Sequence, residues 1–234
     1  MPEEKREEKL SGDVKVSSPL LAKIENFWYH YKWPFLGGVF LVIVLVVCLA
    51  QCANNGKGND AFVMIAGAPA PSTTQMRDIE DFLEGYAEDR NGDEKIIVAM
   101  QKYTIYTDAE IAALISDARA HAKELSYNDK QAFLQDLEAT LCFLSRELYE
   151  EEVKAGGILP LSEITATLPS SGVLTGTDGV AYGIELHTLP IAAEGPLKVL
   201  PEDTVLCMRR RPYSAEKELY EANKRLFVRL ITAD

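Results

Sequence analysis

The stretch AFVMIAGAPAPST, residues 61–73, opens the folded part of this 234-residue chain. Its short apolar run, which ends at Gly67, is typical of a buried strand. Ser72 stands three residues before Gln75, the spacing of a capping box, so a helix is predicted to begin directly behind the loop. A strand, a tight loop and a helix in this order are the first step of an α/β fold.

The alternation of strands and helices continues toward the C-terminus. Thr107 and Glu110 have the spacing of a second capping box. Residues 140–145 fit either a strand or the continuation of a helix, because periodicity alone does not separate the two. An α/β sandwich with a largely parallel sheet is therefore predicted for residues 60–234. The other predicted segments are strands over residues 95–106, 180–186 and 204–208, and helices over 107–118, over 127–139 and from Ser214, the last with Leu219, Ala222, Leu226 and Leu230 inward.

An uncharged run precedes this domain. Residues 33–52, WPFLGGVFLVIVLVVCLAQC, would form a helix of about 30 Å, the thickness of the hydrocarbon core of a bilayer. A transmembrane helix is therefore predicted over residues 27–53, with lipid contact through residues 33–52 and with Pro34 in its first turn. Aromatic residues that suit the headgroup level gather at its start: Phe27, Trp28, Tyr29, Tyr31 and Trp33.

Basic residues set the expected orientation of that helix. Six of them lie in the first 32 residues, whereas only Lys57 follows the run closely, so the N-terminus is expected in the cytoplasm and the domain outside. A cleaved signal peptide, or a lipoprotein signal ending at Cys52, is the alternative. The long charged segment before the run favours an uncleaved signal anchor. We expect a single-pass protein of the cell membrane, with a disordered cytoplasmic tail over residues 1–26 and a flexible linker over residues 54–59.

The charge of the chain is acidic and unevenly distributed. It contains 24 Lys and Arg against 36 Asp and Glu, a formal net charge of −12, and the first 32 residues carry six of each sign. The excess therefore lies almost wholly in the domain. Nucleic acid is excluded as a partner, because phosphate binding requires a basic surface.

Short motifs provide no catalytic or metal site. Residues 89–95, DRNGDEK, resemble the start of a calcium loop, but Glu94 stands where a glycine is needed and Met100 where a bidentate glutamate is needed. A turn is predicted there instead. The sequence has no GxSxG and no CxxC motif, and its histidines are scattered as His30, His121 and His187. We expect no enzyme, no cofactor and no metal, and assign no catalytic or ligand-binding residue.

Four other features allow a structural and a functional interpretation. Cys142 and Cys207 lie in apolar runs on the expected oxidising side, where a disulfide or two buried thiols would fit. Residues 150–152, EEE, are most simply a solvated helix face, and residues 209–211, RRR, a charged strand end. The loop of residues 67–72 joins a strand end to a helix start, which is where α/β architecture itself suggests ligand contact.

Several segments, taken in order, resemble extracellular solute-binding proteins of the type 2 periplasmic-binding fold. They are the first strand and helix, EKIIVAMQKYTI (94–105), TLCFLSREL (140–148) with AGGILPL (155–161), and DGVAYGIEL (178–186). The resemblance implies a strand at residues 140–145 and a bacterial, Gram-positive surface location. Such proteins hold their ligand between two lobes, and only 48 residues follow Leu186, so half of that cleft is missing.

Two expectations of function follow. The first is a membrane-anchored, non-catalytic module that binds a small solute or a neighbouring envelope protein. The alternative is a structural or assembly protein of the cell envelope, whose α/β domain serves only as a docking surface.

Overall fold

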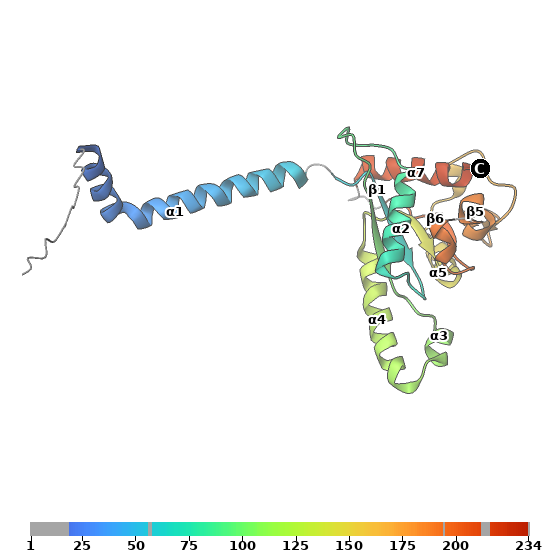
Figure 1. Cartoon of the computed structure of the whole chain (residues 1–234). Coiled ribbons are helices and arrows are strands. Elements are labelled where there is room, and N and C mark those ends of the chain that lie inside the picture. Colours follow the sequence, from blue (N-terminus) through green and yellow to red (C-terminus); the bar gives the residue numbers. More distant parts are fainter. Residues whose placement is uncertain (1–18, 56–57, 194, 212–215, 234) are drawn as a thin grey trace, which may run out of the picture. The chain divides into compact units, whose positions relative to one another are not determined.

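The computed structural model describes residues 19–55, 58–193, 195–211 and 216–233 (Figure 1). The chain divides into two compact units, with the boundary between residues 56 and 57. Residues 1–18 of the predicted tail lie outside the described residues.

Within its described residues, 19–55, the first unit forms one helix, α1 (Pro19–Asn55). From Trp28 to Leu49 this helix is long and apolar enough to cross a membrane, with a mean hydropathy of 2.3 and no buried part, and it is the one such helix in the described residues. The predicted apolar helix is therefore confirmed. It begins earlier than residue 27, so the prediction of disorder is wrong for residues 19–26, where Pro19 supplies a backbone angle suited to a helix start.

Pro34 lies inside α1 and not in its first turn, so that part of the prediction is wrong. A proline inside a helix lacks the N–H that would bond four residues back, here to His30, and its ring crowds that carbonyl. Helices bend at such points. Figure 1 shows α1 bent in its N-terminal part.

The second unit is built on a six-stranded mixed sheet in the order β2-β1-β3-β6-β5-β4. The first half is parallel, because β2 and β3 both run alongside β1 in the same direction. The second half pairs antiparallel from β3 onward. The predicted α/β fold is confirmed, with its parallel pairing confined to the first three strands. The strands are β1 (Ala61–Ala66), β2 (Val98–Tyr103), β3 (Leu141–Leu144), β4 (Val173–Thr175), β5 (Ala181–Glu185) and β6 (Val205–Met208).

Helices cover both faces of this sheet. Successive strand residues point to opposite faces, and β1, β3 and β6 are apolar throughout because both faces are buried. Val63 and Ile65 pack with Leu83 and Phe227 on one face, and Met64 packs with Phe133, Leu148 and Tyr149 on the other. The helices are α2 (Thr73–Glu84), α3 (Asp108–Ala113), α4 (Ser116–Gln135), α5 (Arg146–Lys154), α6 (Pro190–Ala193) and α7 (Lys217–Thr232), with 3₁₀ turns at Leu161–Glu163, Leu186–Thr188 and Pro196–Val199.

Local signals for helix starts and faces are confirmed. Both predicted capping boxes form: Ser72 Oγ accepts from the Gln75 amide at 3.3 Å, and Thr107 Oγ1 accepts from the Glu110 amide at 3.1 Å. β3 confirms the strand expected at residues 140–145. The four residues predicted to face inward from the last helix are buried in α7: Leu219, Ala222, Leu226 and Leu230.

Several segment boundaries differ from prediction. The last helix begins at Lys217, and its predicted start, Ser214, lies outside the described residues. The strand expected over residues 95–106 is shorter, because amides on both sides of β2 bind side chains: Ile97 N–H donates to Asp60 Oδ2 at 2.8 Å and Thr104 N–H to Asp129 Oδ2 at 2.6 Å. The helices expected over 107–118 and 127–139 are instead α3 and the long α4. Arg119 stabilises the break, since its guanidinium donates to the carbonyls of residues 112 and 114 at the end of α3. Figure 1 shows α3 and α4 as a hairpin that extends away from the sheet.

Cys142 and Cys207 are register partners on β3 and β6, and both are fully buried free thiols. Burial raises the pKa of Cys142 to about 12 and that of Cys207 well above its ordinary value. Thiols react as thiolates, so both should be inert in the native fold.

We expect maleimide to label neither Cys142 nor Cys207 in the native protein at neutral pH and both after unfolding in guanidinium chloride, as read by peptide mass spectrometry. A Cys142–Cys207 disulfide peptide from the non-reduced protein would contradict this.

Candidate functional site

The strand connections diverge between the carboxyl ends of β1 and β3. From β1 the chain passes through α2 to β2 on one side, and it later reaches β3 on the other side. Ligands of open α/β sheets usually bind at such a switch point. A crevice of 540 Å³ opens here, a size suited to small ligands. We call it the switch-point crevice; its walls include Ala68, Thr107 and Ser145 with the charged residues Glu110, Arg146, Glu147, Glu150 and Asp203.

Two loops approach each other closely beside the crevice. Ser145 N–H donates to the Ala66 carbonyl at 2.9 Å, which ties the end of β3 to the end of β1. Gly67 makes this contact feasible, because its φ is +141° and a Cβ there would lie 2.8 Å from Ser145 Cβ. The predicted ligand loop of residues 67–72 contributes Ala68 to the crevice wall.

The crevice is acidic. Arg146 is the one basic residue among the described residues that line it, and it already binds Glu185 at 3.0 Å and lies 3.8 Å from Glu150. Its backbone amide, the first of α5, lies 3.5 Å from Asp203 Oδ2. Carboxylates on three sides with a neutralised arginine favour a cationic ligand and disfavour an anionic one. The four carboxylates come from α3, α5 and the loop before β6: Glu110, Glu147, Glu150 and Asp203.

The segment that resembles a calcium loop forms the predicted turn. The Asp89 carboxylate accepts from the amides of Gly92 at 2.7 Å and Glu94 at 2.8 Å. Desolvation raises the pKa of the Asp89 carboxyl, but the backbone hydrogen bonds together outweigh it and hold this pKa below its usual value. Gly92 and Glu94 both have positive φ, at 69° and 63°. In the described part of the chain, no cluster of three or more His, Cys, Asp or Glu could hold a metal ion.

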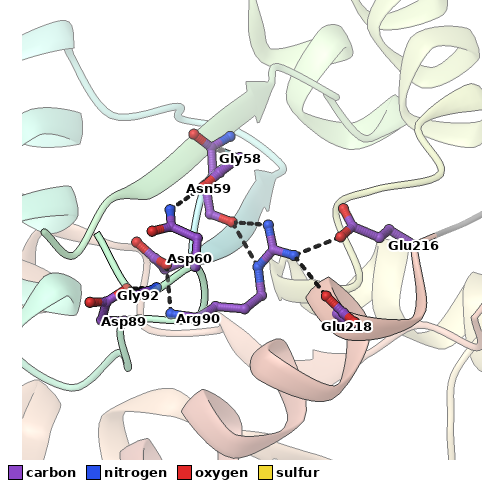
Figure 2. A network of polar contacts seen from close by, with 9 residues as sticks. Gly58, Asn59, Asp60, Asp89, Arg90, Gly92, Glu216 and Glu218 are labelled. Carbon is purple, nitrogen blue, oxygen red and sulfur yellow. Dashed lines mark hydrogen bonds and ion pairs between the residues drawn. The ribbon is translucent and has the colours of Figure 1, made fainter. Parts of the chain in front are cut away.

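A polar network beside this turn joins the start of the domain to α7 (Figure 2). Asp60 is 1% exposed, and its carboxylate accepts from the amides of Arg90 at 2.7 Å and Ile97 at 2.8 Å. The Arg90 guanidinium donates to the Asn59 carbonyl and pairs with Glu216 at 2.6 Å. Because these groups satisfy one another, the network holds structure together and offers little to a ligand. Sequence reasoning missed it, since no local pattern links residues 60, 90 and 216.

The two charge runs, residues 150–152 and 209–211, each contain a residue that makes contacts within the domain. The Arg209 guanidinium donates to the carbonyls of Phe133 and Asp136 at 3.1 and 3.0 Å, which closes the end of α4. Glu152 is only 8% exposed and lies 4.0 Å from Arg209, so the prediction of a solvated face is wrong for this residue. Burial raises the pKa of Glu152, although the Arg209 charge partly counteracts it.

The histidines lie in three separate places. His187 lies just after β5, and its Nε2 is 3.0 Å from the Leu200 carbonyl oxygen. His121 is exposed on α4, and His30 contacts Tyr29 on α1.

Comparisons of the chain with protein-family models, with curated proteins and with solved structures found no match.

Proposed function

We propose that this chain is a membrane-anchored binding protein of the bacterial cell surface. Its α1 serves as an uncleaved anchor with the N-terminus in the cytoplasm, and its α/β domain lies outside and binds a small solute without transforming it. An unburied apolar window of 22 residues supports the anchor, and the basic residues before it support the orientation. The resemblance to extracellular solute-binding proteins is the further support for the location.

The switch-point crevice is the observation that carries the binding function. It combines a 540 Å³ volume with the position at which α/β sheets hold ligands. Its charge favours a small organic cation such as a diamine, whose ammonium groups would bind carboxylates. Neither a histidine nor a cysteine is among the described residues that line it, and this favours binding over nucleophilic catalysis.

Titration calorimetry of the full chain in lipid nanodiscs tests this proposal. We expect putrescine to bind saturably and succinate not to bind in the crevice. Asp203→Asn and Glu147→Gln should each lower the affinity for putrescine about tenfold, because each removes one charge-assisted contact. Glu202→Gln is the matched control, because Glu202 is exposed next to Asp203 but does not line the crevice. Absence of putrescine binding, or equal loss in the control, would reject a cation site here.

Docking of an envelope protein is the second candidate function. The hairpin of α3 and α4 carries Ile115, which is 76% exposed, and Tyr127, which is 67% exposed. Exposed apolar side chains on a projecting element suit protein contact. A chain that binds no cation but purifies from membranes with a second protein would favour this candidate.

A further inference from the structure

The helix α1 is longer than a bilayer requires. Its 37 residues extend over about 55 Å, whereas about 20 residues cross the hydrocarbon core. A span of that length that begins at Pro34 ends near residue 53. Residues 19–33, about 22 Å of helix, then remain on its N-terminal side. We call them the juxtamembrane segment.

A bend separates the juxtamembrane segment from the rest of α1. Pro34 lies inside the helix, where its missing N–H removes the backbone bond toward His30. Helices change direction at such a residue, and Figure 1 shows α1 bent in its N-terminal part. The juxtamembrane segment can therefore run along the bilayer surface while the span crosses the bilayer.

The juxtamembrane segment is amphipathic by helical period. At about 100° per residue, one stripe about 100° wide contains positions 20, 24, 27, 28 and 31, together with position 35 beyond the bend. The residues there are Leu20, Ile24, Phe27, Trp28, Tyr31 and Phe35. The charged, amide and imidazole residues of the segment all fall outside the stripe: Lys23, Glu25, Asn26, His30 and Lys32. Lysine on one side, with leucine and aromatic residues on the other, is typical of a helix that lies in the membrane interface.

The aromatic residues next to the bend support contact with lipid headgroups. Trp28, Tyr29, Tyr31 and Trp33 are all exposed, and Trp33 is 76% exposed. Tryptophan and tyrosine are enriched at the membrane–water interface, where an apolar ring and a polar N–H or O–H are both accommodated. The centroid of the Trp28 ring lies 6.0 Å from that of the Phe35 ring, so the stripe is continuous with the apolar span.

We propose that the juxtamembrane segment binds the surface of the membrane that α1 crosses. Its stripe lies at the boundary between headgroups and acyl chains, and its polar side faces water. Lys23 and Lys32 then lie at the level of the lipid phosphates, which attract lysine. The inference rests on the proposed function, because it requires α1 to be an anchor, and it adds a second lipid-binding element to that anchor.

Tryptophan fluorescence of the full chain in lipid vesicles tests the proposal. Trp28 and Trp33 are the two tryptophans of the chain, so Trp33→Phe and Trp28→Phe each leave one reporter. The vesicles contain phosphatidylcholine and phosphatidylglycerol, with bromine placed near the headgroups or near the acyl-chain ends. A straight continuation of the span would place Trp28 about 7.5 Å farther from the bilayer centre than Trp33. We expect Trp28 to be at least as deep as Trp33, because Trp28 belongs to the stripe and Trp33 lies on the opposite side of the helix.

A polar substitution in the stripe provides a matched comparison. In the variant that retains Trp28, Ile24→Asn should lower the quenching of Trp28 about twofold, because it lowers the affinity of the segment for the interface. Ala22→Asn introduces the same side chain outside the stripe and should leave the quenching unchanged. Equal loss in both variants would overturn the proposal.

The remaining outcomes separate this proposal from the anchor itself. A Trp33 that is deeper than Trp28 would overturn the surface helix and leave the anchor in place. Blue-shifted emission of Trp28 without quenching by brominated lipid would mean that protein covers the stripe, and it would also overturn the surface helix. No quenching of either tryptophan at any depth would overturn the anchor together with this proposal.

Discussion

Replacing Asp60 with alanine is expected to lower the free energy of unfolding of the α/β domain by about 3 kcal/mol. The carboxylate accepts from two backbone amides, those of Arg90 and Ile97, and is almost fully buried. Alanine would leave both amides without an acceptor, and each unsatisfied buried group costs about 1–3 kcal/mol. Denaturation by guanidinium chloride of the full chain in detergent micelles, followed by circular dichroism, measures this loss.

Two variants make the Asp60 prediction specific. Asp60→Asn keeps one carbonyl acceptor and should lose about half as much stability as Asp60→Ala. Asp78→Ala removes an exposed carboxylate from α2 and should change stability by less than about 0.5 kcal/mol. If Asp60→Ala and Asp78→Ala unfold at the same denaturant concentration, the network of Figure 2 contributes no stability.

Features set by neighbours in sequence could be predicted for this protein. The capping boxes at Ser72 and Thr107 depend on residues three apart, and the buried face of α7 depends on helical period. The apolar run of residues 33–52 is likewise a local property, and it lies within α1. Such signals are readable because the interacting groups lie within one or two turns of each other.

Features that depend on tertiary contacts could not be predicted. Glu152 lies in a run of three glutamates, a pattern that predicts solvent-exposed side chains. It is buried nevertheless, and it lies 4.0 Å from Arg209, which follows the end of β6. The strand β2 stops where Asp60 and Asp129 bind the flanking amides, and neither partner is near in sequence. The parallel half of the sheet was predictable from alternation, whereas the antiparallel pairing of β3 with β6 joins segments more than 60 residues apart.

The candidate site likewise combines a feature that could be predicted with one that could not. Architecture alone suggested ligand contact at the loop of residues 67–72, and Ala68 of this loop lines the switch-point crevice. The acidic character of the crevice depends on Glu110, Glu147 and Asp203, which come from three separate elements. Charge that converges from distant segments cannot be read from composition, so the acidic character of the crevice could not be predicted.

Replacing Asn223 with leucine is the second change for which we expect a large loss, about 2–4 kcal/mol. This fully buried side chain of α7 accepts from the Phe62 amide at 3.0 Å through Oδ1 and donates to Thr140 Oγ1 at 2.9 Å through Nδ2. β3 pairs with β1 only from Val63 and Leu141 onward, so the Phe62 amide lies just outside that ladder and depends on Asn223. Leucine fills the volume but leaves this amide without an acceptor.

A double-mutant cycle with Thr140→Val separates the two bonds of Asn223. Thr140→Val alone removes the acceptor of Nδ2 and should cost about 1 kcal/mol, less than Asn223→Leu, because the bond to Phe62 persists. In Asn223→Leu the threonine hydroxyl has already lost its partner, so adding Thr140→Val should cost little more. We therefore expect the two losses to be non-additive by about 1 kcal/mol, measured by denaturant unfolding of the full chain. Strict additivity would mean that the hydrogen bond between Asn223 and Thr140 contributes nothing to the stability of the domain.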